Sequence, residues 1–291
     1  MSRNFLDLDS PYCDYDSCRA VVFPCPYEKT TSYLKGTVYG PQRIIEASAQ
    51  VELFDIETTS EAYKCGIHTL APFDYSAGTV DTWLDSTEVA ICAQLKTGKF
   101  PIILGGEHTI SIAPIRACSK HFGPSQMSVL HLDAHSDMRE EYQGNRYSHA
   151  SIMKRAHACV QHTYSVGIRA QSIEENEYLT VNKHRFGVLY DQERFAKGLS
   201  VEEALRYLPT EKVYITIDLD YFQPEEVPSV GTPVPGGGSW YETIKFLRGI
   251  FQKRQVVGFD VVELKPDHDK RSDFFAAQLV YKLITYKFQG T

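Results

Sequence analysis

The sequence has few of the features that mark membrane or secreted proteins. Its 291 residues hold no uninterrupted apolar run near the roughly 20 residues that a membrane span needs. The most apolar candidate, Phe274 to Ile284, is short and is broken by Gln278 and Lys282. Near the N-terminus, Asp7 and Asp9 stand where a secretory signal has an apolar run. We therefore expect neither a membrane partner nor a secretory signal.

Cysteine and basic residues are also in short supply. The seven cysteines are an odd number and contain no C-x-x-C pair, which disfavours a disulfide framework or a structural zinc site. Reduced thiols predict a cytoplasmic protein. Lys and Arg total 30 against 37 Asp and Glu, so the formal net charge is −7. This balance disfavours nucleic acid as a partner and suits a small cationic molecule.

The chain does contain an alternation of strand-like and helix-like segments. A content of 43% hydrophobic and 12% aromatic residues excludes a disordered protein. Short β-branched and aromatic runs predict strands at Ala20–Phe23, Val51–Phe54, Pro101–Leu104, Met127–Leu132, Thr163–Val166, Phe186–Tyr190, Val213–Leu219 and Val256–Val262. Helical periodicity predicts helices at Pro41–Ala49, Ser86–Thr97, Thr109–His121, Ala150–Cys159, Ser172–Thr180, Ser200–Tyr207, Ser239–Gln252 and Asp273–Lys287.

This alternation predicts an α/β fold. Strands and helices that alternate at such spacing form βαβ crossovers and a mainly parallel sheet. Ser200 followed by Glu203, and Ser239 followed by Glu242, are typical of capping boxes at helix starts. No repeat, low-complexity tract or linker divides the chain, so we expect residues 1–291 to form a single domain.

Residues able to carry chemistry gather where predicted strands end. The carboxyl edge of such a sheet holds its ligand crevice. Four strand ends run into Gly105-Gly106-Glu107-His108, Asp133-Ala134-His135-Ser136-Asp137, Asp218-Leu219-Asp220 and Glu263. In extended backbone, residues two apart point to one face, so Asp218 and Asp220 are expected to project together. The same holds for Asp133, His135 and Asp137 wherever the chain stays extended.

A crevice with this content favours metal ions. Four carboxylates crowded together repel one another unless cations lie between them, and two divalent ions balance the four charges. A set of carboxylates and imidazoles without thiolate suits manganese and, less sharply, iron, cobalt or nickel. The expected ligands are His108, Asp133, His135, Asp137, Asp218 and Asp220. His131 and His157 are interpreted as packing residues.

The same segments resemble a known family. The stretches Gly105–Thr109, Asp133–Asp137 and Asp218–Asp220 resemble the three metal-binding motifs of the ureohydrolases, the arginase and agmatinase family. Val230–Gly237 is similar to the G-T-P-x-P-G-G segment of that family, and Gly40–Ile45 to its early G-P-x-x-I segment. The resemblance covers about Val21 to Glu263. It implies a three-layer α/β/α sandwich around an eight-stranded, mainly parallel sheet, two Mn²⁺ ions per subunit, and a trimer or hexamer.

The resemblance also implies roles for individual residues. His108 and Asp137 would hold one ion, His135 and Asp220 the other, and Asp133 and Asp218 would bridge both. Glu263 would accept paired N–H bonds from a planar guanidinium group. His149 would bind the substrate with it and act as the general acid for the leaving amine.

Within the family, the loop from Asp137 to Ala150 and the segment Val166–Arg169 are more similar to agmatinases than to arginases. The predicted reaction is agmatine plus water to putrescine plus urea. Glu140 and Glu141 favour an amine-bearing tail over a carboxylate, although Arg139 and Arg146 lie in the same loop. Other ureohydrolase substrates stay open: guanidinobutyrate, guanidinopropionate, formimidoylglutamate and arginine.

Two departures from the family pattern bear on the substrate. Gln223 stands where the family has Asp before a proline, and Lys265 follows Glu263 in a loop unlike the usual one. A metal-dependent phosphoesterase is a competing hypothesis, but no basic phosphate-holding cluster accompanies the motifs. A non-catalytic polyamine-binding subunit would need a broken ligand set, and the set is intact.

Overall fold

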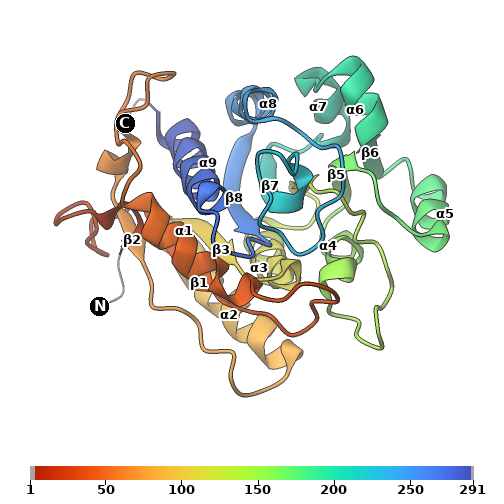
Figure 1. Ribbon diagram of the computed structural model, residues 1–291, viewed down its shortest axis with the longest axis horizontal. Coiled ribbons are helices and arrows are strands. Elements are labelled where there is room, and N and C mark those ends of the chain that lie inside the picture. Colours follow the sequence, from red (N-terminus) through yellow and green to blue (C-terminus); the bar gives the residue numbers. More distant parts are fainter. Residues whose placement is uncertain (1–3, 290–291) are drawn as a thin grey trace.

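The strands form one parallel sheet. A computed structural model describes residues 4–289, and its eight strands lie in the order β2-β1-β3-β8-β7-β4-β5-β6 (Figure 1). All pairings between neighbouring strands are parallel. Their bounds are β1 Ala20–Cys25, β2 Ile67–Thr69, β3 Phe100–Gly105, β4 Met127–Leu132, β5 His162–Ile168, β6 Phe186–Tyr190, β7 Lys212–Asp218 and β8 Gln255–Val262.

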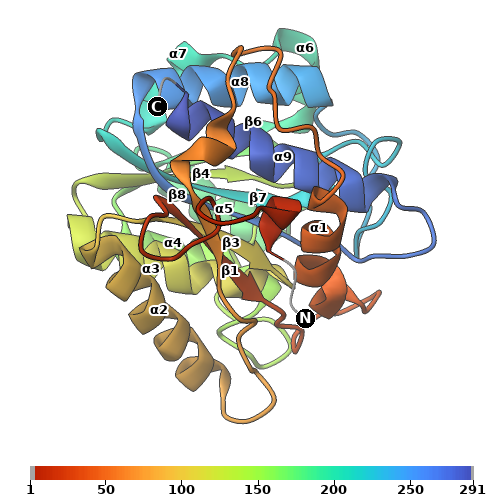
Figure 2. The same ribbon diagram turned by 90° about the vertical axis from the view of Figure 1, so that its left-hand side faces the viewer.

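Helices cover both faces of this sheet. Figure 2 shows α8 and α9 above the strands and α2 and α3 below them. The helices are α1 Gly40–Ser48, α2 Val80–Lys96, α3 Ile112–Phe122, α4 Ile152–Cys159, α5 Ile173–Val181, α6 Asp191–Lys197, α7 Val201–Tyr207, α8 Trp240–Lys253 and α9 Arg271–Phe288. Short 3₁₀ turns are η1 Phe5–Asp7, η2 Thr37–Tyr39, η3 Ala62–Cys65, η4 His108–Ser111, η5 His149–Ser151 and η6 Leu219–Tyr221.

Two hydrophobic cores explain why the sheet lies in the middle. Side chains of β1 alternate between them: Ala20 and Val22 pack with α1, α8 and α9, whereas Val21 and Phe23 pack with α2 and α3. Successive residues of a strand point to opposite faces, so a strand that is apolar throughout needs a cover on each side. The predicted three-layer α/β/α sandwich with a parallel sheet is confirmed.

The sequence-based elements differ from the structure in a few places. Residues 51–54 form turns rather than a strand, and the second strand is the short β2. The apolar side chains of Val51 and Leu53 pack into the core beside α9, where the Leu53 carbonyl accepts a bond from Tyr281 Oη. Helix α6 was not predicted. Ser200 caps α7 through the Glu203 N–H as expected, but Ser239 makes no side-chain cap bond.

The strand order brings distant segments together at one edge. The four central strands are β3, β8, β7 and β4, and His108, Glu263, Asp218 and Asp133 stand at or just after their carboxyl ends. Gly106 helps to close this edge, since a Cβ there would lie 2.1 Å from the Tyr27 carbonyl oxygen. Within residues 4–289, all seven cysteines are free, and none of the helices is long and apolar enough to cross a membrane.

Candidate metal centre

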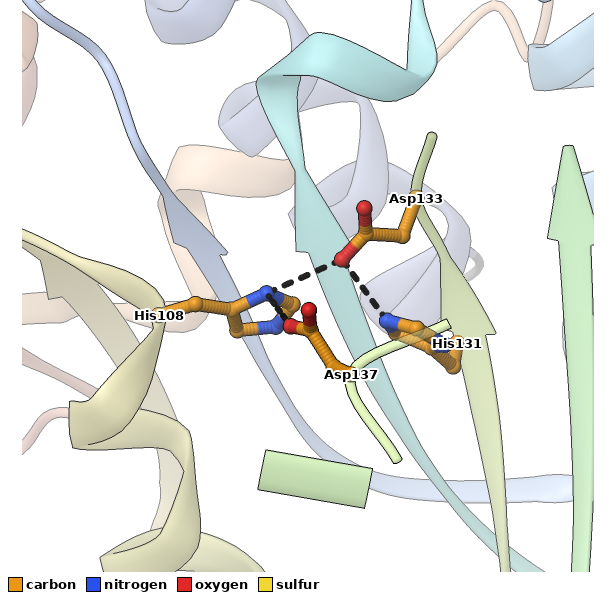
Figure 3. Close-up of side chains that lie close together, drawn as sticks. All are labelled: His108, His131, Asp133 and Asp137. Atoms are coloured by element: carbon orange, nitrogen blue, oxygen red, sulfur yellow. Dashed lines mark hydrogen bonds and ion pairs between the residues drawn. The ribbon is translucent and has the colours of Figure 1, made fainter. Parts of the chain in front are cut away.

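The first half of the site surrounds one nitrogen of His108. Its Nδ1 lies 3.1 Å from Asp133 Oδ2, and it lies 3.3 Å from Asp137 Oδ2 and 3.3 Å from Asp218 Oδ2. Figure 3 shows His108 and Asp137 on one side of Asp133 and His131 on the other. The His108 imidazole and these carboxylates are all buried. One imidazole nitrogen therefore faces three carboxylates from two separate segments of the chain, the loop after β4 and the end of β7.

The second half of the site surrounds His135. Its Nδ1 lies 3.0 Å from Asp220 Oδ2 and 3.5 Å from Asp133 Oδ1. Asp133 therefore turns one carboxylate oxygen to each histidine, which is the geometry of a bridging ligand. Asp218 Oδ2 faces His108, while its Oδ1 accepts the Asp220 backbone N–H at 2.8 Å. All six predicted ligands thus belong to one connected cluster.

The side chains converge by a route that differs from the expected one. Strand alternation was expected to align them, but β4 ends at Leu132 and β7 ends at Asp218. Beyond those ends, Asp220 lies in η6 and Asp137 has a left-handed φ of 51°. Glu263 has a φ of 66° as well. Left-handed backbone costs energy for a residue with a side chain, and such strain is typical of functional sites.

Burial and crowding shift the acid–base behaviour of the cluster. Burial and the charge of Asp133 raise the pKa of Asp137 to about 7. Burial and the charge of Asp220 raise the pKa of Asp218 well above its usual value. Burial opposes a charged His135, but Asp220 and Asp133 outweigh it and raise the pKa of His135 to about 12. The cluster thus holds protons that a divalent cation would displace.

A hydroxyl and a carboxylate fix the orientation of His108. Its Nε2 lies 2.9 Å from Thr216 Oγ1, and that hydroxyl donates to Asp260 Oδ1 at 2.6 Å. Since the hydroxyl hydrogen is used on Asp260, Thr216 accepts from Nε2–H, and Nδ1 is the nitrogen that faces the three carboxylates. Burial opposes a charged His108, but Asp133, Asp137 and Asp218 outweigh it and raise the pKa of His108 well above its usual value. A buried Nδ1 surrounded by three carboxylates fits a metal ion, which would take the place of the proton there.

The structure corrects the interpretation of His131. Rather than only packing, it places Nε2 2.8 Å from Asp133 Oδ2 and Nδ1 3.0 Å from Ser165 Oγ. It therefore orients the carboxylate shared by the two halves of the site. His157 does pack, since its ring stacks on Phe186, although its Nε2 also lies 3.0 Å from Thr163 Oγ1.

The cluster forms the floor of a cavity of about 240 Å³. Glu263 and His149, the other two residues that the resemblance indicates, line the same cavity. The Glu263 Oε1 accepts the His108 backbone N–H at 2.7 Å, which fixes its carboxyl group beside the cluster. Burial and the charge of Glu107 raise the pKa of Glu263 well above its usual value, and a cation bound beside this carboxyl group would oppose that rise.

Arg169 secures the wall of the cavity. Its guanidinium donates to the backbone carbonyl oxygens of Asp220 at 2.7 Å, Val234 at 2.9 Å and Pro235 at 3.1 Å. The side chain thereby ties the loop that contains Gly231 and Thr232, both in the cavity wall, to the end of β7. In the segment Val166–Arg169, which is similar to agmatinases in sequence, Arg169 thus has a structural role in the cavity wall.

Glu140, which was expected to favour an amine-bearing substrate tail, lies outside the cavity lining. Glu140 pairs with Arg155 at 2.7 Å, Lys154 at 3.5 Å and Arg146 at 3.6 Å, and it does not line the cavity. Glu140 therefore does not contact a substrate tail from the cavity lining. Gln223 and Lys265 do not line the cavity either; their backbone N–H groups bond to the carbonyls of Gly238 and Ser229. The sequence departures lie behind the cavity wall.

Comparison with known proteins places this site in a family. The family model described as "Arginase family" matches residues 18–285. The chain belongs to the arginase family. It is 37% identical to the N(1)-aminopropylagmatine ureohydrolase of Synechocystis sp., with 98% of this chain and 94% of that protein covered. It is 30% identical to the agmatinase of Bacillus anthracis, with 93% and 92% covered.

Among solved structures, the agmatine ureohydrolase of Thermoplasma volcanium is similar, with a TM-score of 0.87 and 29% identity. The match covers 99% of this chain and 94% of that chain. Arginase-family ureohydrolases hydrolyse guanidino C–N bonds and depend on a binuclear metal centre, and the His–Asp cluster of this chain could hold metal ions. This chain is therefore a ureohydrolase. The residues that the sequence did not point to, Thr216 and Asp260, lie behind the ligands rather than among them.

Proposed function

We propose that this arginase-family ureohydrolase acts on N(1)-aminopropylagmatine and releases urea and spermidine. Water adds to the guanidine carbon, the bond from that carbon to the alkyl-bearing nitrogen breaks, and this nitrogen gains a proton. The observation that carries the proposal is the cavity whose floor is the His–Asp cluster and whose walls include Glu263 and His149. It combines metal-ligand chemistry, a guanidinium acceptor and a proton carrier in one space.

We propose that two divalent ions, Mn²⁺ first, bind in this floor. His108, Asp137, Asp133 and Asp218 would hold one ion, and His135, Asp220, Asp133 and Asp218 the other. The buried Nδ1 of His108 among three carboxylates and the absence of thiolate from the described cluster fit such ions. When bound, the ions supply a water activated for attack near neutral pH.

Glu263 is the proposed anchor of the guanidinium group. Its carboxyl lies on the cavity wall, and its Oε1 is held by the His108 N–H at 2.7 Å. A planar guanidinium brings paired N–H donors and a positive charge to this carboxyl group. The anchor would fix the guanidine carbon above the cluster, and such positioning supplies a large part of the rate of an addition reaction.

His149 is the proposed proton carrier. Burial, with the positive charges of His135 and His108, lowers the pKa of His149 to about 4. The imidazole is therefore neutral at physiological pH, and it first accepts a proton from the attacking water before it donates one to the leaving nitrogen. A general acid alone, as expected from the sequence, would start with that proton already in place.

The rim of the cavity favours a long, amine-bearing tail. Tyr33 and Leu34 line the mouth and are 70% and 39% exposed. Methylene groups would cover this apolar surface, and protonated amines bind well over tyrosine rings. The cation of the rim, Arg139, is engaged, with its guanidinium carbon 5.1 Å from the ring centre of Tyr142. Higher identity to the aminopropylagmatine enzyme than to the agmatinase supports the same substrate.

Agmatine is the second candidate, supported by the likeness to the Thermoplasma agmatine ureohydrolase. Purified protein loaded with Mn²⁺, Fe²⁺, Co²⁺ or Ni²⁺ would be tested on both compounds and on arginine, guanidinobutyrate and guanidinopropionate for urea, and on formimidoylglutamate for formamide. We expect the highest kcat/KM with N(1)-aminopropylagmatine and Mn²⁺. A higher kcat/KM with agmatine would select the second candidate, and a preference for a carboxylate tail would contradict both. Cytoplasmic location and a trimer or hexamer complete the proposal.

A further inference from the structure

Beneath the cavity, one hydroxyl group connects a buried carboxylate to His149. The Glu107 side chain is fully buried and accepts bonds from the Thr30 backbone N–H and the Thr30 hydroxyl, each at 2.8 Å. The hydroxyls of Thr31 and Thr109 donate to it at 2.9 and 3.0 Å. The Thr30 oxygen also lies 3.1 Å from His149 Nδ1 and 3.2 Å from the His149 backbone nitrogen.

Counting hydrogens settles the direction of these bonds. The hydroxyl of Thr30 has one hydrogen, and the Glu107 carboxylate at 2.8 Å is the strongest acceptor near it, since the Thr109 hydroxyl at 3.3 Å itself donates to Glu107. The Thr30 oxygen therefore only accepts toward His149, and its contact with Nδ1 is a hydrogen bond only if Nδ1 carries a hydrogen. A neutral imidazole has a single N–H group, so Nε2 is left with the lone pair.

The other nitrogen of the ring lies on the cavity side. Ser32 Oγ is 3.5 Å from His149 Nε2, and both residues line the cavity, whereas Thr30 does not. Tyr142 packs edge-on against the imidazole, with ring centres 5.5 Å apart and an angle of 86°. The ring is thus held from behind by Thr30 and from the side by Tyr142, with Nε2 toward the space for substrate.

We propose that Thr30 and Glu107 are positioning residues that keep His149 in its Nδ1–H form, so that Nε2 is the atom that moves the proton. Nε2 takes the proton from water as the C–O bond forms, and it gives a proton to the alkyl nitrogen as the C–N bond breaks. The imidazole therefore ends the cycle as it began. This inference rests on the proposed function, because it assigns His149 a step in guanidine hydrolysis.

The tautomer can be read without any turnover. Protein carrying ¹⁵N-histidine and loaded with diamagnetic Zn²⁺ would be studied by long-range ¹H–¹⁵N NMR, with the His149 signals assigned from a His149→Gln variant. We expect the Nδ1–H form in the parent protein and in Thr30→Ser. Thr30→Val, which lacks the hydroxyl, is expected to shift His149 toward Nε2–H. Thr31→Val is the matched control, since it removes a donor to Glu107 without contact to His149.

Kinetics with the best guanidine substrate and Mn²⁺ provide the second readout. Thr30→Val is expected to lower kcat by about 10- to 100-fold, part of the effect of a general acid–base group, and to leave KM within about twofold. Thr30→Ser is expected to restore kcat. An Nε2–H parent, or an unchanged tautomer in Thr30→Val, would overturn the inference even if that variant were unstable, since the parent measurement stands alone. Failure to hydrolyse any guanidine would instead refute the proposed function and leave the tautomer result in place.

Discussion

The link from Asp260 through Thr216 to His108 predicts a measurable loss of metal affinity. Thr216→Val keeps the shape of the side chain and removes the hydroxyl that accepts from His108 Nε2–H and donates to Asp260. All three side chains are buried, so water does not replace the lost partner without rearrangement. The imidazole is then free to rotate or to place its hydrogen on Nδ1, where the metal ligand lone pair is needed.

Loss of such an orienting partner lowers metal affinity by about 10- to 100-fold. This corresponds to about 1.4–2.7 kcal/mol of binding free energy. Competition with a chelator of known affinity would measure it, with metal content determined by elemental analysis. Thr285→Val is the control, because its buried hydroxyl bonds only within α9, to the Tyr281 carbonyl. An affinity of Thr216→Val within twofold of the parent would refute the reasoning.

Three further predictions follow from other parts of the molecule. Asp133→Asn is expected to lose both ions and all detectable urea release, because this carboxylate faces both histidines. His149→Ala is expected to keep both ions and to lose about 10²- to 10⁴-fold in kcat. Lys282→Met is expected to lower the free energy of unfolding at pH 7 by about 1.5–3 kcal/mol, since it removes the partly buried cation of Asp55, whereas Glu57 keeps Arg248 at 2.9 Å. Denaturant unfolding would measure this last effect.

The pH dependence of the Lys282 effect has a definite sign. Burial alone would raise the pKa values of Asp55 and Glu57, but bonds to Lys282, Thr58 and Tyr286 outweigh it and lower both. The stabilisation is therefore complete above the ordinary values of 3.8 and 4.5 and is lost as pH falls through the lowered ones. The difference between parent and Lys282→Met should shrink in acid. A constant difference from pH 7 to pH 2 would contradict this account.

The predictions for Asp133→Asn, His149→Ala and Lys282→Met can each be contradicted or controlled. Turnover retained by Asp133→Asn would exclude it as the bridge between the two halves, and metal loss in His149→Ala would make His149 a ligand. Lys197→Met, which breaks an exposed pair with Glu193, is the control for Lys282→Met and should cost less than about 1 kcal/mol.

The sequence was sufficient to predict the layers of the fold and the edge that carries the site. Runs such as Met127–Leu132 place apolar residues on both faces of the strand, as a strand covered on both sides requires. The sequence was not sufficient to predict which strands lie side by side. Glu263 is 155 residues from His108, and only the placement of β8 beside β3 brings them together. Residues 51–54 failed as a strand because their apolar side chains are used against α9.

Some of the missed residues did leave a signal. His131, Thr216 and Asp260 are polar residues with apolar residues on either side in their strands, and all three are fully buried. A polar group inside such a strand needs a buried partner. Searching for such polar residues would have indicated the layer of residues behind the metal ligands. Thr30 left no such signal, because it lies in a loop of polar and turn-forming residues.

His108 turns Nδ1 and His149 turns Nε2 toward the cavity, and the same arrangement of side chains orients both rings. A carboxylate holds a hydroxyl as an acceptor, and the hydroxyl holds one imidazole N–H: Asp260 with Thr216 for His108, and Glu107 with Thr30 for His149. A carboxylate directly on the ring would favour the charged imidazolium. A hydroxyl in between fixes the tautomer while it keeps the negative charge away from the ring. His149 can therefore be oriented by a buried carboxylate system and still have a pKa lowered to about 4, as a group that must first accept its proton requires.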